Sequence, residues 1–352
     1  NPAKEKSVAR ADQTLMFAET AQAGAALARQ RDAYPALLAP VIARLRAADP
    51  AVLVTCARGS SDHAASYAKY VFELRGLGPV ASHAPSITSI YGAAFPGGTR
   101  AALIGVSQSG KSPDLIAAMT SARAAGAVSL ALVNAPDSPL AAAAEMAVPL
   151  LAGPEHSIAA TKSCLAAMAA LARLAAMWRD DAALLAALDA APAMMAAAID
   201  LDWSAALAAL APARSLYVVG RGLTFAAAQE AALKLKETAG LHAEAVSAAE
   251  LRHGPAAIAA DGMPILIFAP TDQARAGIPA LIDDLDARGA KVIAIGLDHP
   301  KALHLPMPPQ VHSALTPLAQ LVSFYRFAAE LAVLRGFDPD KPAGLHKVTE
   351  TR

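Results

Sequence analysis

Cysteine is scarce in this chain, which has only Cys56 and Cys164 in 352 residues. Two distant cysteines supply neither the paired spacing of a metal site nor the disulfide framework of a small secreted domain. Cys56 lies within a candidate ligand loop, but no neighbouring pattern supplies a base to activate it, so we expect a small buried residue and not a nucleophile. A reducing compartment is therefore expected.

The chain also has no excess of positive or negative charge. Lysine and arginine total 30, aspartate and glutamate total 30, and there is no basic block or stripe with interleaved aromatics. Neither a nucleic acid nor an anionic membrane is therefore an expected partner. Every long apolar stretch contains charge or proline, and the first six residues are polar, unlike a signal peptide. These absences predict a globular protein of the cytoplasm.

Glycine-rich nucleotide motifs are absent too. No G-x-x-x-x-G-K-[ST] occurs, and no G-x-G-x-x-G follows a predicted strand. Nucleotide binding is therefore not the favoured hypothesis. What the chain does have is a large apolar fraction, 55%, beside 17% charged residues. It can bury a large core, and its length suits two domains better than one.

Short apolar runs alternate with stretches of helical periodicity, which is typical of βαβ units and a parallel sheet covered by helices. We predict strands at residues 52–55, 80–81, 102–106, 129–133 and 147–150, then at 216–220, 265–268 and 292–295. Helical segments precede the first strand, with breaks at Pro35 and Pro40, and join the two halves, with a break at Pro192. Strand, glycine-containing turn and helix recur in both halves, which indicates an internal duplication.

The expected organisation has four parts. They are an N-terminal helical lead-in (1–46), a first α/β domain (47–199), a second α/β domain (200–340) and a C-terminal tail (341–352).

The most informative stretch is 103–114, where an apolar strand runs into a hydroxyl-rich turn and then a helix. Ser107, Ser109 and Ser112 can donate to phosphate oxygens, and the amides of a helix beginning near Pro113 point at the same place. An alternative is that these hydroxyls merely cap the helix. A second hydroxyl-bearing loop, which includes Ser61, also ends a predicted strand, and two such loops can hold one small phosphorylated ligand.

The second half offers different groups. Its counterpart of the serine turn, 268–272, has one hydroxyl, an acid and no glycine, so we expect only the first half to keep the phosphate site. Lys234 and Glu237 share one face of a predicted helix, an arrangement that is usually a solvated surface. His253 precedes a Gly-Pro turn, where an imidazole can titrate or merely cap. His242 lacks the spacing of a metal site.

Several motifs in this order resemble the double sugar-isomerase (SIS) domain family. They are Ser107-Gln108-Ser109-Gly110, Gly153-Pro154-Glu155, Ala160-Thr161-Lys162, the run 231–237, His242-Ala243-Glu244 and the run 250–255. The resemblance spans nearly the whole chain. Within the family, the chain is similar to the isomerase half of glutamine:fructose-6-phosphate aminotransferase. It implies two flavodoxin-like three-layer domains, a phosphorylated sugar substrate, and no metal or other cofactor.

The resemblance also implies roles for particular residues. Glu237 would move the proton, Lys234 would be a supporting cation, His253 would assist ring opening from the partner subunit of a homodimer, and Lys347 would hold the sugar carbonyl. The phosphate and sugar would be held by Ser61, Ser107, Gln108, Ser109 and Ser112. A carboxylate on a rigid helix suits proton transfer between adjacent carbons, and a lysine amine can form a Schiff base.

Departures from the family pattern bear on the substrate. No glutaminase domain with its N-terminal cysteine precedes the isomerase region, Ala160 stands where serine is usual, and the tail lacks a serine after Lys347. Glutamine-dependent synthesis is therefore not expected. The leading hypothesis is a deaminase that converts glucosamine 6-phosphate to fructose 6-phosphate and ammonia. The alternatives are an isomerase or deglycase for another amino-sugar phosphate or amine adduct, a non-catalytic sugar-phosphate regulator, and an inactive partner subunit.

Overall fold

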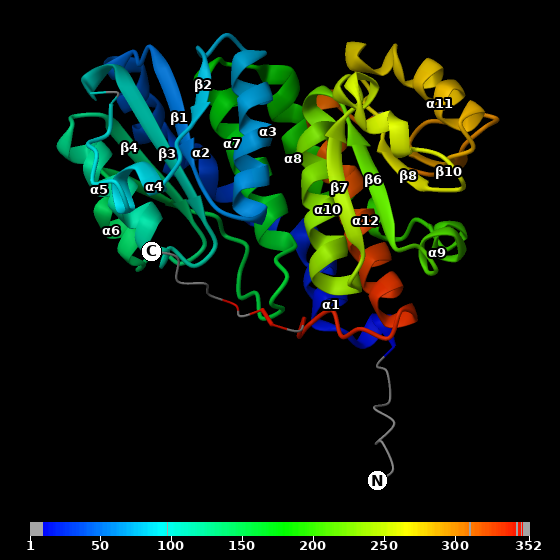
Figure 1. Cartoon of the computed structure of the whole chain (residues 1–352). Coiled ribbons are helices and arrows are strands. Elements are labelled where there is room, and N and C mark those ends of the chain that lie inside the picture. Colours follow the sequence, from blue (N-terminus) through cyan, green and yellow to red (C-terminus); the bar gives the residue numbers. More distant parts are fainter. Residues whose placement is uncertain (1–9, 97, 310, 343, 346, 348–352) are drawn as a thin grey trace.

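The computed structural model describes residues 10–96, 98–309, 311–342, 344–345 and 347. Two five-stranded parallel sheets stand side by side with helices packed on both faces of each (Figure 1). The first sheet has the order β2-β1-β3-β4-β5, with β1 (Val52–Cys56), β2 (Val80–Ser82), β3 (Ala101–Ser107), β4 (Val128–Val133) and β5 (Met146–Pro149). The predicted fold class, two α/β units of three layers, is confirmed.

The second sheet repeats that strand order. It runs β7-β6-β8-β9-β10, with β6 (Ser215–Gly220), β7 (His242–Ser247), β8 (Pro264–Phe268), β9 (Lys291–Ile295) and β10 (Leu303–Leu305). Thus β6 takes the place of β1, β7 that of β2, and β8 that of β3. Every predicted strand forms, but β7 and β10 are not signalled by the sequence, because both are edge strands and neither has a continuous apolar run.

Four helices pack together between the sheets and join the two halves in one core (Figure 1). They are α3 (Ser60–Glu73), α7 (Lys162–Trp178), α10 (Phe225–Ala239) and α12 (Thr316–Leu334). The outer faces are covered by α5 (Pro113–Ala124) and α6 (Pro139–Ala143) on the first sheet and by α11 (Ile278–Ala287) on the second. Short helices complete the chain, namely α1 (Leu15–Ala21), α4 (Ser86–Ser89) and α9 (Ala205–Leu210). Because α3 packs against α10, groups from both halves reach one place.

The predicted helix breaks at prolines are wrong. Helix α2 (Ala23–Ala48) continues through Pro35 and Pro40, and α8 (Ala182–Ile199) continues through Pro192. Each proline removes one backbone N–H donor and crowds the preceding turn. The two helices pack against each other and against α7, and their buried faces stabilise the helical path despite that local cost.

Helix α8 is long and apolar enough to cross a membrane by length and composition alone. It nevertheless packs against α2, α7 and α12. It also contains Asp189, whose Oδ1 accepts a hydrogen bond of 2.8 Å from Arg173 Nη2 on α7. These contacts place α8 in the packed helical layer of the protein.

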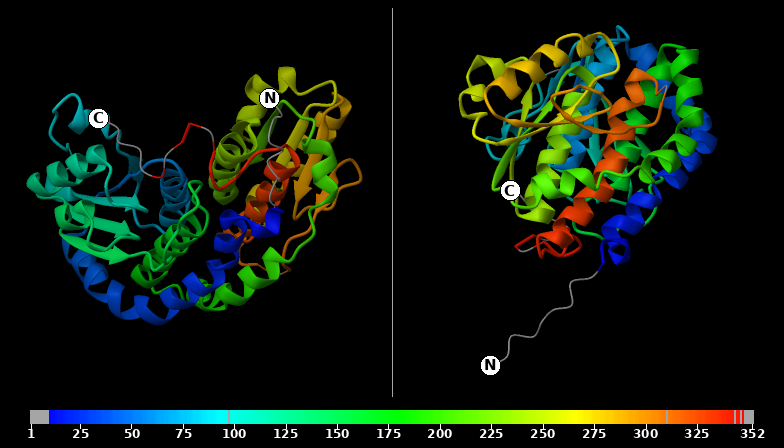
Figure 2. Two further views of the ribbon diagram at one scale, coloured as in Figure 1. Left: turned by 90° about the horizontal axis from the view of Figure 1, so that it is seen from below. Right: turned by 90° about the vertical axis from the view of Figure 1, so that its right-hand side faces the viewer.

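The chain after α12 turns back towards the first half (Figure 2). Asp340 is the anchor of this segment: its carboxylate accepts hydrogen bonds from Leu15 N (2.7 Å) and Met16 N (2.8 Å), and its carbonyl accepts one from Ile158 N (3.4 Å). Asp340 is thereby held beside the loop that leads into α7.

Candidate functional site

A cavity of about 340 Å³ lies where the two halves meet. The first half contributes the loops that follow β1 and β3, the second contributes α10, and the tail contributes Leu345 and Lys347. All five residues expected to bind the sugar phosphate line it: Ser61, Ser107, Gln108, Ser109 and Ser112. Three of the four residues expected to act on the sugar, Lys234, Glu237 and Lys347, line it too.

The turn between β3 and α5 is held in shape by its own serines. Ser107 Oγ accepts a hydrogen bond of 3.0 Å from Gly110 N, and Ser109 Oγ accepts one of 3.3 Å from Lys111 N. Gly110 has φ +63°, and a Cβ there would lie 2.1 Å from Ser138 Oγ, so only glycine fits. Ser112 occupies the N-cap position of α5 without a side-chain capping bond. The serines therefore shape the turn and line the cavity, and the simple helix-capping alternative does not describe Ser112.

Arg58 is a cavity residue that sequence reasoning missed. It lies on the loop after β1, and its Nε and Nη2 both donate to Asp114 Oδ2, at 2.9 and 2.6 Å. Asp114 is on the first turn of α5 and is buried. The carboxylate thus holds a guanidinium at the wall of the serine turn, where a phosphate would find a charged donor. The sequence signal was present in Arg58 itself, directly before Gly59-Ser60-Ser61.

Lys234 and Glu237 do not form a solvated helix face, so that interpretation is wrong. Lys234 is 1% exposed, and its Nζ lies 2.5 Å from Glu237 Oε2 and 3.6 Å from Glu230 Oε1. Burial disfavours the charged ammonium, but the two carboxylates outweigh burial and raise the pKa of Lys234. Glu237 remains partly exposed in the cavity wall, so it is the carboxylate that can meet a ligand.

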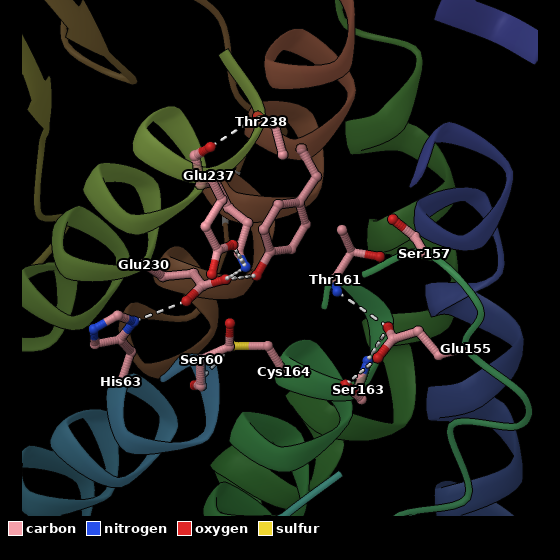
Figure 3. Close-up of polar contacts among 12 residues, drawn as sticks. Ser60, His63, Glu155, Ser157, Thr161, Ser163, Cys164, Glu230, Glu237 and Thr238 are labelled. Atoms are coloured by element: carbon pink, nitrogen blue, oxygen red, sulfur yellow. Dashed lines mark hydrogen bonds and ion pairs between the residues drawn. The ribbon is translucent and has the colours of Figure 1, made fainter. Parts of the chain in front are cut away.

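Glu230 is the second residue that sequence reasoning missed. It is fully buried, one helical turn before Lys234, and accepts hydrogen bonds from Tyr325 Oη (3.0 Å) and from His63 Nδ1 (2.8 Å), as Figure 3 shows. Burial acts to raise the pKa of Glu230, but the charge of Lys234 and the bond from His63 reverse that effect and lower it. Because His63 belongs to α3 and Glu230 to α10, this buried cluster also ties the two halves together.

Lys347 reaches the cavity from the tail. Its Nζ donates to Ser157 O at 2.5 Å and lies 3.8 Å from Glu155 Oε2. Burial lowers the pKa of Lys347, and the nearby carboxylates only partly offset the effect. A lower pKa gives a larger fraction of free amine, which is the nucleophilic form of lysine.

The loop beneath Lys347 is fixed by two buried carboxylates. Glu155 accepts hydrogen bonds from Thr161 N (3.0 Å), Ser163 N (3.1 Å) and Ser163 Oγ (2.5 Å), as drawn in Figure 3. Glu19 of α1 accepts hydrogen bonds from the backbone N–H groups of His156 and Ser157. The loop therefore presents the Ser157 carbonyl to Lys347 from a rigid support.

The remaining candidates lie elsewhere. His253 is exposed at the end of a short 3-10 helix (Glu250–His253) and does not line this cavity. Cys56 is buried, as expected, and burial raises the pKa of its thiol to about 12. Across the described residues, no group of three or more His, Cys, Asp or Glu side chains is placed to hold a metal ion.

Proteins with open parallel α/β sheets bind their ligands outside the carboxyl ends of the strands, and the cavity lies there in this protein. Residues 48–177 and 209–324 each match the SIS domain family model. The chain belongs to the SIS domain family, in a two-domain arrangement of the phosphosugar isomerase type.

Three proteins of known sequence or structure are similar to this chain. A glutamine–fructose-6-phosphate aminotransferase (isomerizing) of Bradyrhizobium diazoefficiens is 33% identical over 306 residues, which is 82% of this chain and 50% of the relative. The chain spans about half the length of such curated relatives. A solved structure from Silicibacter pomeroyi DSS-3, assigned as a phosphosugar isomerase, is 41% identical with TM-score 0.88, covering 93% of this chain and 100% of that one. The C-terminal domain of glucosamine-fructose-6-phosphate aminotransferase from Francisella tularensis is 23% identical with TM-score 0.81, covering 94% and 98%, and shows the shared fold.

Proposed function

We propose that this protein is an amino-sugar-phosphate deaminase of the cytoplasm, which converts glucosamine 6-phosphate and water to fructose 6-phosphate and ammonia. The observation that carries the proposal is that one cavity joins a serine turn suited to a phosphate with Glu237, a carboxylate set against a buried ammonium. A phosphate at the turn places the far end of the sugar towards α10.

The proposed reaction begins with the open-chain aldehyde. Glu237 removes the proton from C2 and returns it to C1, while the C2 nitrogen loses one proton to solvent and the C1 oxygen gains one and becomes a hydroxyl. The C2 amine is left as an imine, to which water adds, and collapse of that adduct releases ammonia and leaves the C2 ketone. Lys347 holds the open-chain carbonyl, and Lys234 balances the charge of Glu237 throughout.

The direct test is incubation of the protein with glucosamine 6-phosphate in the absence of glutamine. Equal amounts of ammonia and fructose 6-phosphate are expected. If neither product forms while the sugar phosphate still raises the melting temperature, the deaminase proposal fails and a regulator or a different amino-sugar phosphate takes its place. Galactosamine 6-phosphate and phosphorylated amine adducts then form the next panel.

His253 provides a prediction about assembly. We infer that the protein is a homodimer in which His253 of the partner subunit reaches the cavity and assists ring opening. Glu237→Gln and His253→Gln are each expected to be nearly inactive. Unfolded and refolded together in equal amounts, they should recover about a quarter of wild-type turnover, because half of the dimers then contain one intact site. No recovery on mixing, or a strict monomer by light scattering, would contradict the shared site.

Arg58 provides a prediction about phosphate recognition. Arg58→Ala is expected to raise KM for glucosamine 6-phosphate by about tenfold or more with little change in kcat, since it removes a charged donor to the phosphate. Arg31→Ala is the matched control, because Arg31 is an exposed arginine on α2 whose ion pair is with Asp32. Arg58→Lys keeps a charge near Asp114, and its KM should lie between the KM values of Arg58→Ala and Arg31→Ala. An unchanged KM in both Arg58 variants would remove Arg58 from the site.

A further inference from the structure

A second cavity, of about 290 Å³, occupies the second half at the place that corresponds to the first cavity in the first half. Its walls come from the loops after β6, β7 and β8, which are the counterparts of β1, β2 and β3. The two cavities share no lining residue. The internal duplication therefore extends from the sheets to a hollow at the carboxyl ends of their strands.

The two hollows also share an arginine on the same turn. Arg58-Gly59 follows β1 and Arg221-Gly222 follows β6, and both arginines line their cavities. Gly59 has φ +55° and Gly222 has φ +58°, so both turns place a glycine at a positive φ. The serine turn is not duplicated. After β8, the counterpart of β3, the second cavity has Gln273, and Arg252 joins the wall from the 3-10 helix after β7.

Arg221 and Arg252, the two arginines of the second cavity, each contact one neighbouring side chain through their guanidinium groups. Arg221 Nη1 donates to Ser247 Oγ at 3.3 Å, and Arg252 Nη2 lies 3.0 Å from Asp284 Oδ2 at the exposed rim. Each guanidinium carries five N–H donors, so further donors remain for a ligand. Asp284 is outside the cavity wall, and the lining residues include no aspartate, glutamate, lysine or histidine. The wall therefore offers positive charge and amide groups, with no group for acid–base chemistry.

We propose that this cavity is a second anion-binding site, which takes a small phosphate monoester and performs no reaction on it. Paired arginines match the oxygens of a phosphate through forked hydrogen bonds, and about 290 Å³ accommodates a phosphorylated compound of sugar size. The site does not depend on the proposed deaminase activity, because it uses none of the groups of the first cavity.

The test counts binding sites for inorganic phosphate by equilibrium dialysis with labelled phosphate. The wild-type protein is expected to bind two phosphates per chain, and Arg221→Ala/Arg252→Ala is expected to bind one. Ser109→Glu, which places a carboxylate in the serine turn, should also bind one, and the combined variant none. Arg288→Ala removes an exposed arginine at the end of α11, outside the cavity, and should still bind two.

The outcomes separate this proposal from the function of the first cavity. If the wild-type protein bound one phosphate per chain and the arginine substitutions did not change that number, the proposal of a second site would be wrong. If the Ser109→Glu protein still bound two phosphates, the first cavity would not be a phosphate site. If the double variant fails to fold, Arg252→Gln alone is used, and it should weaken the second phosphate by about tenfold or more. Unchanged affinity in a folded Arg252→Gln protein would equally contradict the proposal.

Discussion

Exchange of Glu237 for glutamine is expected to lower kcat for glucosamine 6-phosphate by about 10²–10⁴-fold, the range in which general acid–base groups act. The amide keeps the size of the side chain and its place in the cavity wall but cannot accept the C2 proton. KM should change little, because the serine turn on the opposite side is untouched. Steady-state release of fructose 6-phosphate measures both constants.

The matched control for Glu237→Gln is Glu244→Gln. Glu244 is exposed on the edge strand β7 and takes no part in the cavity, so the same chemical change there should leave kcat within a small factor of wild type. Exchange of the C2 hydrogen with solvent deuterium gives a second readout, which should disappear in Glu237→Gln alone. Retention of full turnover in that variant would exclude Glu237 as the proton carrier.

Replacement of Lys234 by methionine is expected to destabilise the protein by about 3–5 kcal/mol, because it leaves the fully buried Glu230 carboxylate without its cation. Turnover should fall as well, since Glu237 loses its partner. The pKa of Lys234 is raised in the fold, so its contribution is fully present below the ordinary lysine value of about 10.4 and is lost only as the pH rises through the folded pKa. The titration of Lys234 itself should therefore add nothing to a change in the stability difference between pH 7 and pH 9.

Urea denaturation at both pH values tests this, with Lys236→Met as the control. Lys236 is on the same helix but exposed, so its replacement should cost little. The double variant Glu230→Gln/Lys234→Met removes both buried charges and should regain much of the lost stability. A Lys234→Met protein as stable as Lys236→Met would show that the buried cluster does not depend on the ammonium.

The architecture could be predicted well from the sequence because apolar runs and helical periodicity report directly on burial. The errors came where tertiary packing overrides local preference. Pro35, Pro40 and Pro192 look like helix ends in isolation, yet they lie inside helices whose long buried faces hold the helical path. Strand β7 is mostly short or polar residues, and only its pairing with β6 makes it a strand.

The residues of the candidate site could be predicted from the sequence less completely than the architecture. The hydroxyl turn is a local pattern that the sequence shows directly, whereas the roles of Lys234 and Glu237 were expected only from the family resemblance. Arg58 has a local signal, since it stands directly before a glycine and two serines. Its partner Asp114 and the partner of Glu230, His63, are far away in sequence, and no local pattern reveals such pairs. Spacing alone could not predict that Lys234 is buried, since a Lys/Glu helix face has the same sequence pattern whether it meets water or another helix.

The cluster that joins His63 to Glu230 has a consequence for how the protein folds. The two residues are 167 positions apart in sequence, and Lys347 and Ser157 are separated by 190. Closing such long loops costs chain entropy before any contact is gained. During synthesis the serine turn can therefore form early, with the first sheet, whereas Glu237 of α10 and Lys347 join the cavity only when the second half has docked. Under the proposed function, the growing chain would bind a phosphate before it could act on a sugar.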